Sequence, residues 1–132
     1  MQQLLIWTYF QDPKGHTLGI LGFGSIGGEV ARKAQALGMK VIYNKRTRLP
    51  QEHEEKLNIK YATFDELIQS SDCISIHVPL SKDSRHLLSK REFDMMKPRV
   101  RIVHTSRVSG WYEIRVHTNT KSPVYMLGCC YR

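Results

Sequence analysis

The sequence lacks any uninterrupted apolar run close to the roughly 18 residues that a membrane-spanning helix needs. Its opening, MQQLLIWTYF, has neither the basic start nor the cleavage pattern of a secretory signal. These absences argue against a membrane-bound protein and favour a cytoplasmic location. With 132 residues, of which 41% are apolar, the chain has room for one domain with a core of its own.

Cysteine is also scarce, with three residues in the whole chain. Cys73 lies inside an apolar run, whereas Cys129 and Cys130 are adjacent near the end. Such an arrangement offers neither a paired disulfide framework nor the spacing of metal ligands. We therefore expect reduced thiols and no metal site.

Acidic residues are outnumbered, and the formal net charge is +8. A basic surface can bind nucleic acid without any motif. Most of the charge is scattered, however, and the one cluster fits a small anionic ligand as well as a polyanion. The interpretation therefore includes no nucleic-acid partner, and a steep salt dependence of oligonucleotide affinity would contradict it. The cluster consists of Arg32, Lys33, Lys40, Lys45, Arg46 and Arg48.

Short apolar runs alternate with stretches of helical periodicity, which is typical of an α/β fold with a parallel sheet covered on both faces. Two capping boxes, Thr63 with Glu66 and Ser89 with Glu92, mark the starts of helices. We predict a doubly wound sheet of about five strands in the order 3-2-1-4-5, with a ligand cleft at the carboxyl ends. The predicted strands are residues 17–21, 40–44, 59–62, 73–78 and 100–104, and the predicted helices include residues 25–37, 52–57, 64–71 and 90–96.

Gly22, Gly24 and Gly27 form a G-x-G-x-x-G pattern that follows a predicted strand and opens a predicted helix. In that setting the first glycine permits a tight turn, the second lets the backbone approach a pyrophosphate, and the third allows close helix–strand packing. The helix N-terminus then offers free N–H groups to the phosphates. The pattern predicts a dinucleotide site, although glycines that merely serve a strand–helix turn are the alternative.

About 20 positions after these glycines, an acidic residue usually meets the adenosine ribose and repels a 2′-phosphate. Residues 44–48 read NKRTR here, with three cations and no acid. One charge-assisted bond to a phosphate contributes roughly 1.5–3 kcal/mol, enough for a preference of about tenfold. The sequence thus predicts that NADP (NADPH) is preferred over NAD. A solvated basic loop without cofactor preference remains the alternative.

With these residues in view, the chain resembles the D-isomer-specific 2-hydroxyacid dehydrogenases, and within them the fungal-type glyoxylate/hydroxypyruvate reductases. The resemblance covers residues 12–107 and rests on TLGILGFGSIG, GMKVIYNKR, FDELIQSSDCISIHVPLSKDSRHLLS and HTSR. It implies a Rossmann NAD(P)-binding domain, a 2-keto or 2-hydroxy acid as the small-molecule partner, and a homodimer in the full-length enzyme.

The resemblance also implies roles for individual residues. Backbone amides of Ser25 and Ile26 would meet the pyrophosphate, and Arg107 would grip the substrate carboxylate and polarise its keto oxygen. His77 is interpreted as structural, and His104 stands where the family usually has Asn. The remaining implied cofactor contacts are Asn44, Lys45, Arg46 and Arg48 at the 2′-phosphate, Val78 and Pro79 at the adenine and ribose, and Thr105 and Ser106 at the nicotinamide ribose.

Hydride transfer to a 2-keto acid also needs a general acid. In the family this is a histidine well downstream of the arginine, and we find no counterpart here. We expect residues 1–11 to be the remnant of a preceding segment and Met1 to be an internal methionine. Residues 108–132 are expected to be a non-family tail, translated intron or frameshifted sequence, without strand periodicity. The sheet would then be truncated after the fifth strand with an exposed edge, and the chain alone would be inactive.

Three function classes follow from this reading. The first is the cofactor-binding part of an NADPH-dependent 2-hydroxyacid reductase. The second is a non-enzymatic NADP-binding or co-repressor-like interaction module, because related folds sense nucleotides. The third is nucleic-acid binding driven by net charge. We favour the first class. The sequence does not identify which 2-keto acid the full-length enzyme would reduce.

Overall fold

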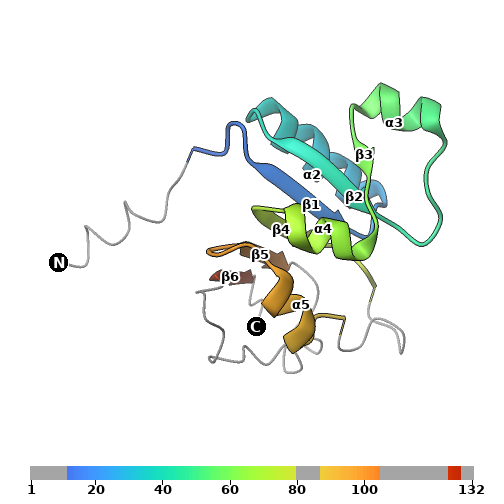
Figure 1. Ribbon diagram of the computed structural model, residues 1–132. Helices are drawn as coiled ribbons and strands as arrows, with labels where there is room; N and C mark the ends of the chain where they lie inside the picture. The colour runs from blue at the N-terminus through green and yellow to red at the C-terminus, as the bar shows by residue number, and fades with distance from the viewer. Residues whose placement is uncertain (1–11, 80–86, 105–124, 129–132) are drawn as a thin grey trace.

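The computed structural model describes residues 12–79, 87–104 and 125–128, the last stretch by its backbone alone. Within these ranges the strands form one parallel sheet in the order β3-β2-β1-β4-β5-β6 (Figure 1). The elements are β1 (Thr17–Leu21), α2 (Ser25–Ala36), β2 (Lys40–Asn44), α3 (Gln51–Leu57), β3 (Lys60–Tyr61), α4 (Phe64–Ser70), β4 (Cys73–Ile76), α5 (Lys90–Met95), β5 (Arg101–His104) and β6 (Tyr125–Gly128).

The predicted fold class and the order of the first five strands are confirmed. One expectation was wrong: β5 does not form the edge of the sheet, because β6 pairs with it in parallel from Arg101↔Tyr125 to His104↔Gly128. The stretch YMLG is four residues long and carries no alternation that would mark it as a strand. Strand pairing of this kind depends on the tertiary setting more than on local sequence.

Two apolar clusters, one on each face, hold the sheet between its helices. On one face α2 packs Ala31 and Ala34 against Leu18 and Ile20 of β1. On the other face α4 and α5 cover the sheet, and the buried members of that cluster are Leu21, Ala62, Leu67, Ile68, Ile74, Ile76, Leu88, Phe93, Met96, Val100 and Ile102. The alternation along β1 follows from strand geometry, since successive side chains point to opposite faces.

The end of α2 shows how local sequence sets the chain direction. Gly38 has φ of +81° and donates its N–H to the Gln35 carbonyl at 2.9 Å, while the Met39 N–H bonds to the Ala34 carbonyl at 3.0 Å. This is a Schellman motif, which satisfies two carbonyls that the helix leaves unpaired. The motif ends α2 and returns the chain directly into β2.

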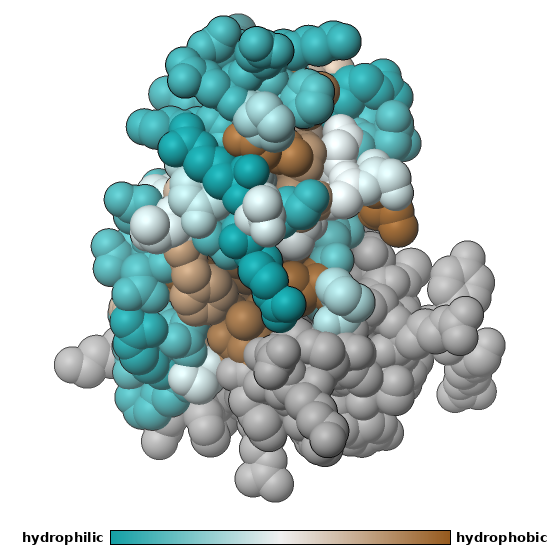
Figure 2. Space-filling model, turned by 90° about the vertical axis from the view of Figure 1, so that its right-hand side faces the viewer, coloured by the Kyte–Doolittle hydropathy of each residue, from teal (hydrophilic) through white to brown (hydrophobic). Residues whose placement is uncertain are grey.

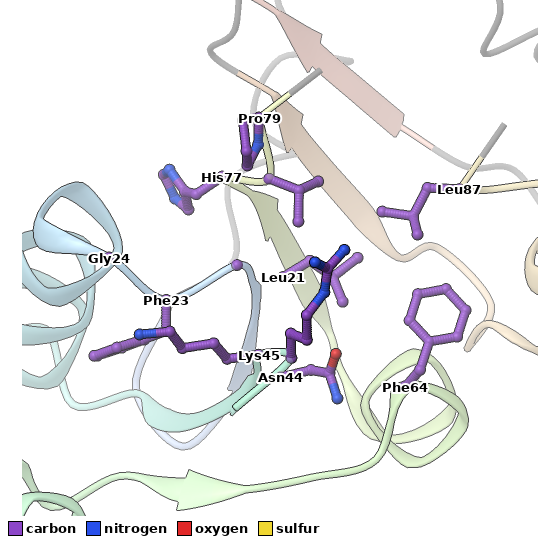
Figure 3. A pocket seen from close by; sticks show the side chains of 12 residues that line it. Leu21, Phe23, Gly24, Asn44, Lys45, Phe64, His77, Pro79 and Leu87 are labelled. Carbon is purple, nitrogen blue, oxygen red and sulfur yellow. The ribbon is translucent and has the colours of Figure 1, made fainter. Parts of the chain in front are cut away.

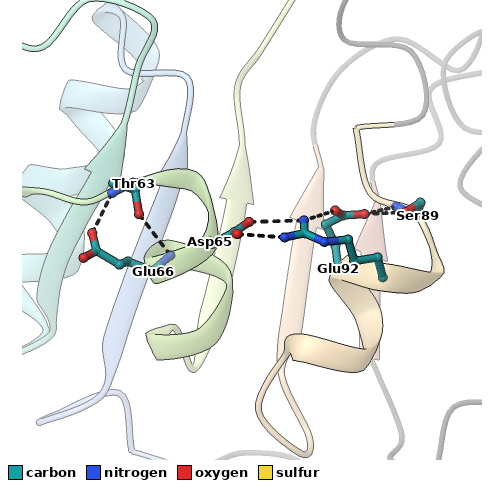
Figure 4. Close-up of polar contacts among 6 residues, drawn as sticks. Thr63, Asp65, Glu66, Ser89 and Glu92 are labelled. Atoms are coloured by element: carbon teal, nitrogen blue, oxygen red, sulfur yellow. Dashed lines mark hydrogen bonds and ion pairs between the residues drawn. The ribbon is translucent and has the colours of Figure 1, made fainter.

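The start of α4 is closed by its own side chains. The Thr63 hydroxyl accepts a hydrogen bond from the Glu66 N–H at 3.3 Å, and the Glu66 carboxylate accepts one from the Thr63 N–H at 2.9 Å. The Glu92 carboxylate accepts the Ser89 N–H at 2.8 Å at the start of α5 (Figure 4). Both predicted capping boxes are therefore present.

The described residues on the face shown in Figure 2 are mostly hydrophilic, with apolar side chains visible in patches between polar ones. No helix in the described part of the chain is both long and apolar enough to cross a membrane. Among the same residues, no group of three or more His, Cys, Asp and Glu side chains could hold a metal ion. Cys73 is a free thiol whose pKa is raised by burial.

Candidate functional site

A pocket of about 670 Å³ opens at the carboxyl ends of β1, β2 and β4. From β1 the chain continues to β2 and β3 on one side of the sheet, and β4 and β5 lie on the other side of β1. The pocket therefore lies at the point where the strand order reverses. Ligands of open α/β sheets bind at such a switch point. The lining residues are Leu21, Gly22, Phe23, Gly24, Asn44, Lys45, Arg46, Phe64, His77, Val78, Pro79 and Leu87 (Figure 3).

The turn after β1 is fixed by the absence of a side chain at Gly22. Its φ is +84°, and a Cβ there would lie 2.8 Å from the Val78 nitrogen and 2.9 Å from the His77 carbonyl carbon. The Gly22 N–H donates to the Asn44 carbonyl at 3.0 Å, which joins the turn to the end of β2. At Gly27 a Cβ would lie 3.1 Å from the Gly22 oxygen, so α2 packs closely against this turn.

Gly24 differs from its two neighbours in the motif, because nothing lies within 4 Å of where its Cβ would be. It is the N-cap of α2, which has no side-chain cap and no acidic residue in its first turn. The N–H groups of Ser25 and Ile26 have no acceptor within the helix, since the first amides of a helix never do. An open glycine beside uncapped amides is the arrangement that a pyrophosphate requires, so these residues fit the cofactor that the motif predicts.

Ser25 and Ile26 do not line the main pocket. Ser25 faces a neighbouring hollow of about 530 Å³ between α2 and α3, and Gly24 borders both spaces. The Ile26 side chain is 66% exposed. The contact predicted for Ser25 and Ile26 is made by their backbone N–H groups. The uncapped start of α2 leaves these groups accessible to a pyrophosphate.

The basic residues after β2 divide into two groups. Lys45 and Arg46 line the pocket together with Asn44, whose side-chain amide is held by the Ala62 carbonyl at 2.9 Å. Arg48 does not line it. Its guanidinium instead binds both oxygens of Glu54 at 2.8 Å, so its charge is already paired within the protein.

Two histidines lie at the carboxyl ends of β4 and β5. His77 lines the pocket, and its Nε2 lies 2.7 Å from the Ser75 hydroxyl. Burial and, second, the neighbouring His104 lower the pKa of His77, while burial lowers the pKa of His104. Both rings are therefore neutral at pH 7, and His77 is equipped for hydrogen bonding rather than for charge.

Val78 and Pro79 line the pocket beside His77, and an apolar wall completes it. In Figure 3, Phe64 and Leu87 lie on the opposite side from Gly24 and Phe23. The sequence reasoning missed Phe23, Phe64 and Leu87 as pocket residues. The sequence signal for these three residues was weak, because an apolar residue beside a turn or a helix start is as typical of the core as of a pocket wall. An apolar wall with few polar groups is typical of a site for a planar organic ring.

Thr105, Ser106 and Arg107 lie outside the described residues. Of the predicted site residues within those ranges, the structure brings seven together around one pocket and leaves four elsewhere. Ser25, Ile26 and Gly27 belong to the start of α2, and Arg48 lies on Glu54. The seven are Gly22, Gly24, Asn44, Lys45, Arg46, Val78 and Pro79.

Comparison with known proteins gives a consistent answer. The family model of the D-isomer specific 2-hydroxyacid dehydrogenase NAD binding domain matches residues 6–113. A glyoxylate reductase of Thermococcus litoralis is 48% identical over 94 residues, which are 71% of this chain and 28% of the relative. The 4-methyl-2-oxopentanoate reductase A of Aspergillus oryzae is 45% identical over 100 residues, which are 76% of this chain and 30% of the relative.

Solved structures agree with these relatives. The D-mandelate dehydrogenase of Rhodotorula graminis superposes with a TM-score of 0.74 at 40% identity, covering 80% of this chain and 31% of that one. The chain thus spans less than a third of the length of these relatives. Because the family model covers most of the chain, the protein belongs to the D-isomer specific 2-hydroxyacid dehydrogenases, of which it carries the NAD-binding domain.

Proposed function

We propose that the chain binds NADPH in preference to NADH, as the cofactor-binding part of a reductase of glyoxylate, hydroxypyruvate or a related 2-keto acid. The observation that carries the cofactor preference is the position of Lys45 and Arg46. They follow β2, where the family fold meets the adenosine ribose, and they line the same pocket as Gly22 and Gly24. Among the described residues that line this pocket none is acidic, so none of them repels a 2′-phosphate.

Each part of the cofactor has a counterpart in the pocket. The pyrophosphate is assigned to Gly24 and to the amides of Ser25 and Ile26, where the helix start carries a partial positive charge. The 2′-phosphate is assigned to Lys45 and Arg46. Charge-assisted bonds of this kind contribute roughly 1.5–3 kcal/mol each, so one bond suffices for a preference of about tenfold.

The bound nicotinamide would supply a hydride to the keto carbon of the substrate. The resemblance assigns Thr105 and Ser106 to its ribose and Arg107 to the substrate carboxylate. A planar, permanently charged guanidinium suits that role, because it donates two parallel bonds to one anion. The proton that must accompany the hydride comes from a histidine in the family, and it lies beyond the matched residues. Within the matched residues, the proposed roles are therefore cofactor binding and substrate orientation.

The glyoxylate and hydroxypyruvate reductases among the relatives support this substrate class. The proposal includes a cytoplasmic location and allows a homodimer through this domain. Sedimentation equilibrium of the full chain tests the dimer.

Titration of the 132-residue chain with the two reduced cofactors, followed by nicotinamide fluorescence, tests the proposal. We expect NADPH to bind at least about tenfold more tightly than NADH. Lys45→Ala should remove much of this difference by weakening NADPH alone. Lys40→Ala is the matched control, because Lys40 is an exposed lysine at the other end of the same strand. Equal dissociation constants for the two cofactors would contradict the preference.

A further inference from the structure

A buried carboxylate lies beneath the segment that carries Lys45 and Arg46. Glu54, in the first turn of α3, is only 6% exposed. Its Oε1 accepts a hydrogen bond from the Tyr43 hydroxyl at 2.6 Å, and its two oxygens accept Arg48 Nε and Nη2 at 2.8 Å each. A buried carboxylate is stable only when its oxygens are satisfied in this way.

Tyr43 connects this carboxylate to both ends of the segment. Its ring is fully buried in β2, and its hydroxyl accepts the Leu49 N–H at 2.9 Å while it donates to Glu54. The ring also packs against Phe23 of the glycine turn, with centroids 5.0 Å apart. Residues 45–50 therefore leave β2 beside Tyr43 and return to its hydroxyl at Leu49.

Arg48 is the third member of this network. Its guanidinium lies 5.3 Å from the centre of the Tyr61 ring and is bound side-on by Glu54. The Arg48 and Tyr43 hydrogen bonds lower the pKa of Glu54 to about 2, so the carboxylate is ionised throughout the physiological range. Arg48 is thereby committed to holding the segment, and Lys45 and Arg46 are the cations of the segment that line the pocket.

We propose that Glu54 is a positioning residue for recognition of the 2′-phosphate. By binding Arg48 and Tyr43 it fixes residues 45–50 in the conformation that presents Lys45 and Arg46 to the pocket. Long cationic side chains on an unfixed loop would lose more conformational freedom on binding, and a fixed loop reduces that loss. This inference rests on the proposed NADPH preference. It assigns Arg48 to the support of the site rather than to the phosphate.

The test compares Glu54→Gln with Glu55→Gln in the full chain. Both substitutions remove one negative charge from α3, but Glu55 is exposed and bonds to Gln51 of its own helix. We expect Glu54→Gln to weaken NADPH binding by about tenfold, the equivalent of one charge-assisted contact, and to leave NADH binding unchanged. Glu55→Gln should change neither dissociation constant.

Tyr43→Phe is a second variant that keeps the buried ring and removes only the hydroxyl. It should also weaken NADPH selectively, and amide hydrogen exchange of the cofactor-free protein should show faster exchange at Leu49. These readouts keep the test decisive if Glu54→Gln fails to fold. A merely structural network would weaken both cofactors equally.

The outcomes separate this inference from the proposed function. Tighter NADPH binding by Glu54→Gln would mean that the released Arg48 binds the phosphate itself, which overturns the positioning role. An unchanged NADPH-to-NADH ratio in both variants would overturn it as well, and would leave the NADPH preference of the unsubstituted chain intact. Equal affinity of the unsubstituted chain for the two cofactors would overturn both proposals.

Discussion

The starts of α2 and α4 solve the same physical problem in opposite ways. Each helix begins with backbone N–H groups that have no partner within the helix. At α4, Thr63 and Glu66 satisfy two of these groups reciprocally. At α2, Gly24 offers no side chain, and α2 is the only helix in the described ranges without an acidic residue in its first turn.

The difference separates a helix start that is closed by the protein's own side chains from one whose first N–H groups have no side-chain cap. A glycine at the N-cap lowers stability by roughly a few tenths of a kcal/mol relative to Ser, Thr, Asn or Asp. The uncapped start of α2 lies beside the glycine turn, whose Gly22 and Gly24 line the pocket. The capped starts of α4 and α5 stabilise those two helices. Arg91 of α5 also connects the two helices, because its guanidinium binds the Asp65 carboxylate of α4 at 2.7 Å (Figure 4).

The largest effect is expected from Gly22→Ala, which would break the turn that aims α2 at the pocket. The new Cβ would meet the backbone of β4's extension, and the residue would be held at φ of +84°. Together these should destabilise the chain by about 3 kcal/mol or more in urea unfolding. Gly28→Ala is the control, because its Cβ meets nothing within 4 Å and alanine favours a helix interior by up to about 1 kcal/mol. Similar stabilities for both variants would contradict the steric explanation.

Gly24→Asp would supply the missing N-cap side chain of α2 and so make its start resemble the capped start of α4. Gly24 has φ of −119°, an extended conformation that any residue adopts, and there is room for a side chain. The carboxylate should cap the helix and stabilise the chain by about 0.5 kcal/mol, while NADPH affinity falls by roughly thirtyfold. Gly24→Asn supplies a cap without charge and should lose less affinity. Undiminished NADPH binding by Gly24→Asp would place the pyrophosphate elsewhere.

Thr63→Ala opens the closed start of α4. Loss of the hydroxyl leaves the Glu66 N–H without its acceptor and should lower the free energy of unfolding by about 1 kcal/mol. Thr63→Ser retains the hydroxyl and should recover most of that loss. NADPH affinity should not change, since neither Thr63 nor Glu66 lines the pocket. A parallel loss of affinity would show that the two helix starts are coupled.

The fold was predictable because its determinants are local. The capping box of α4 spans four consecutive residues, and the glycine turn is framed by a strand and a helix that show their own periodicity. The carboxyl ends of parallel strands meet at one edge of the sheet, which is why Gly22, Asn44 and Val78 were expected together and line one pocket.

What the sequence could not show depends on contacts between elements. Arg48 looks like its neighbours in the sequence, and only the placement of α3 brings Glu54 to it. Gly19 lies inside the predicted strand of residues 17–21 with no signal of its own, yet a Cβ there would collide with Ser71 and Leu67 of the α4 region. The pairing of β6 with β5 likewise has no local signal.

The smallest effect is a pH dependence at the closed start of α4. Hydrogen bonds from Thr63, and then the charge of Lys60, lower the pKa of Glu66 below its ordinary value. The ionised carboxylate therefore stabilises the fold fully above its unfolded pKa of about 4.3, and that contribution disappears as the pH falls through the lower folded value. Glu66→Gln should thus be less stable than the unsubstituted chain at pH 7, with a difference that shrinks steadily below about pH 4 in urea titrations. A difference that stays constant between pH 7 and pH 3 would assign the effect to packing or helix propensity, because those do not titrate.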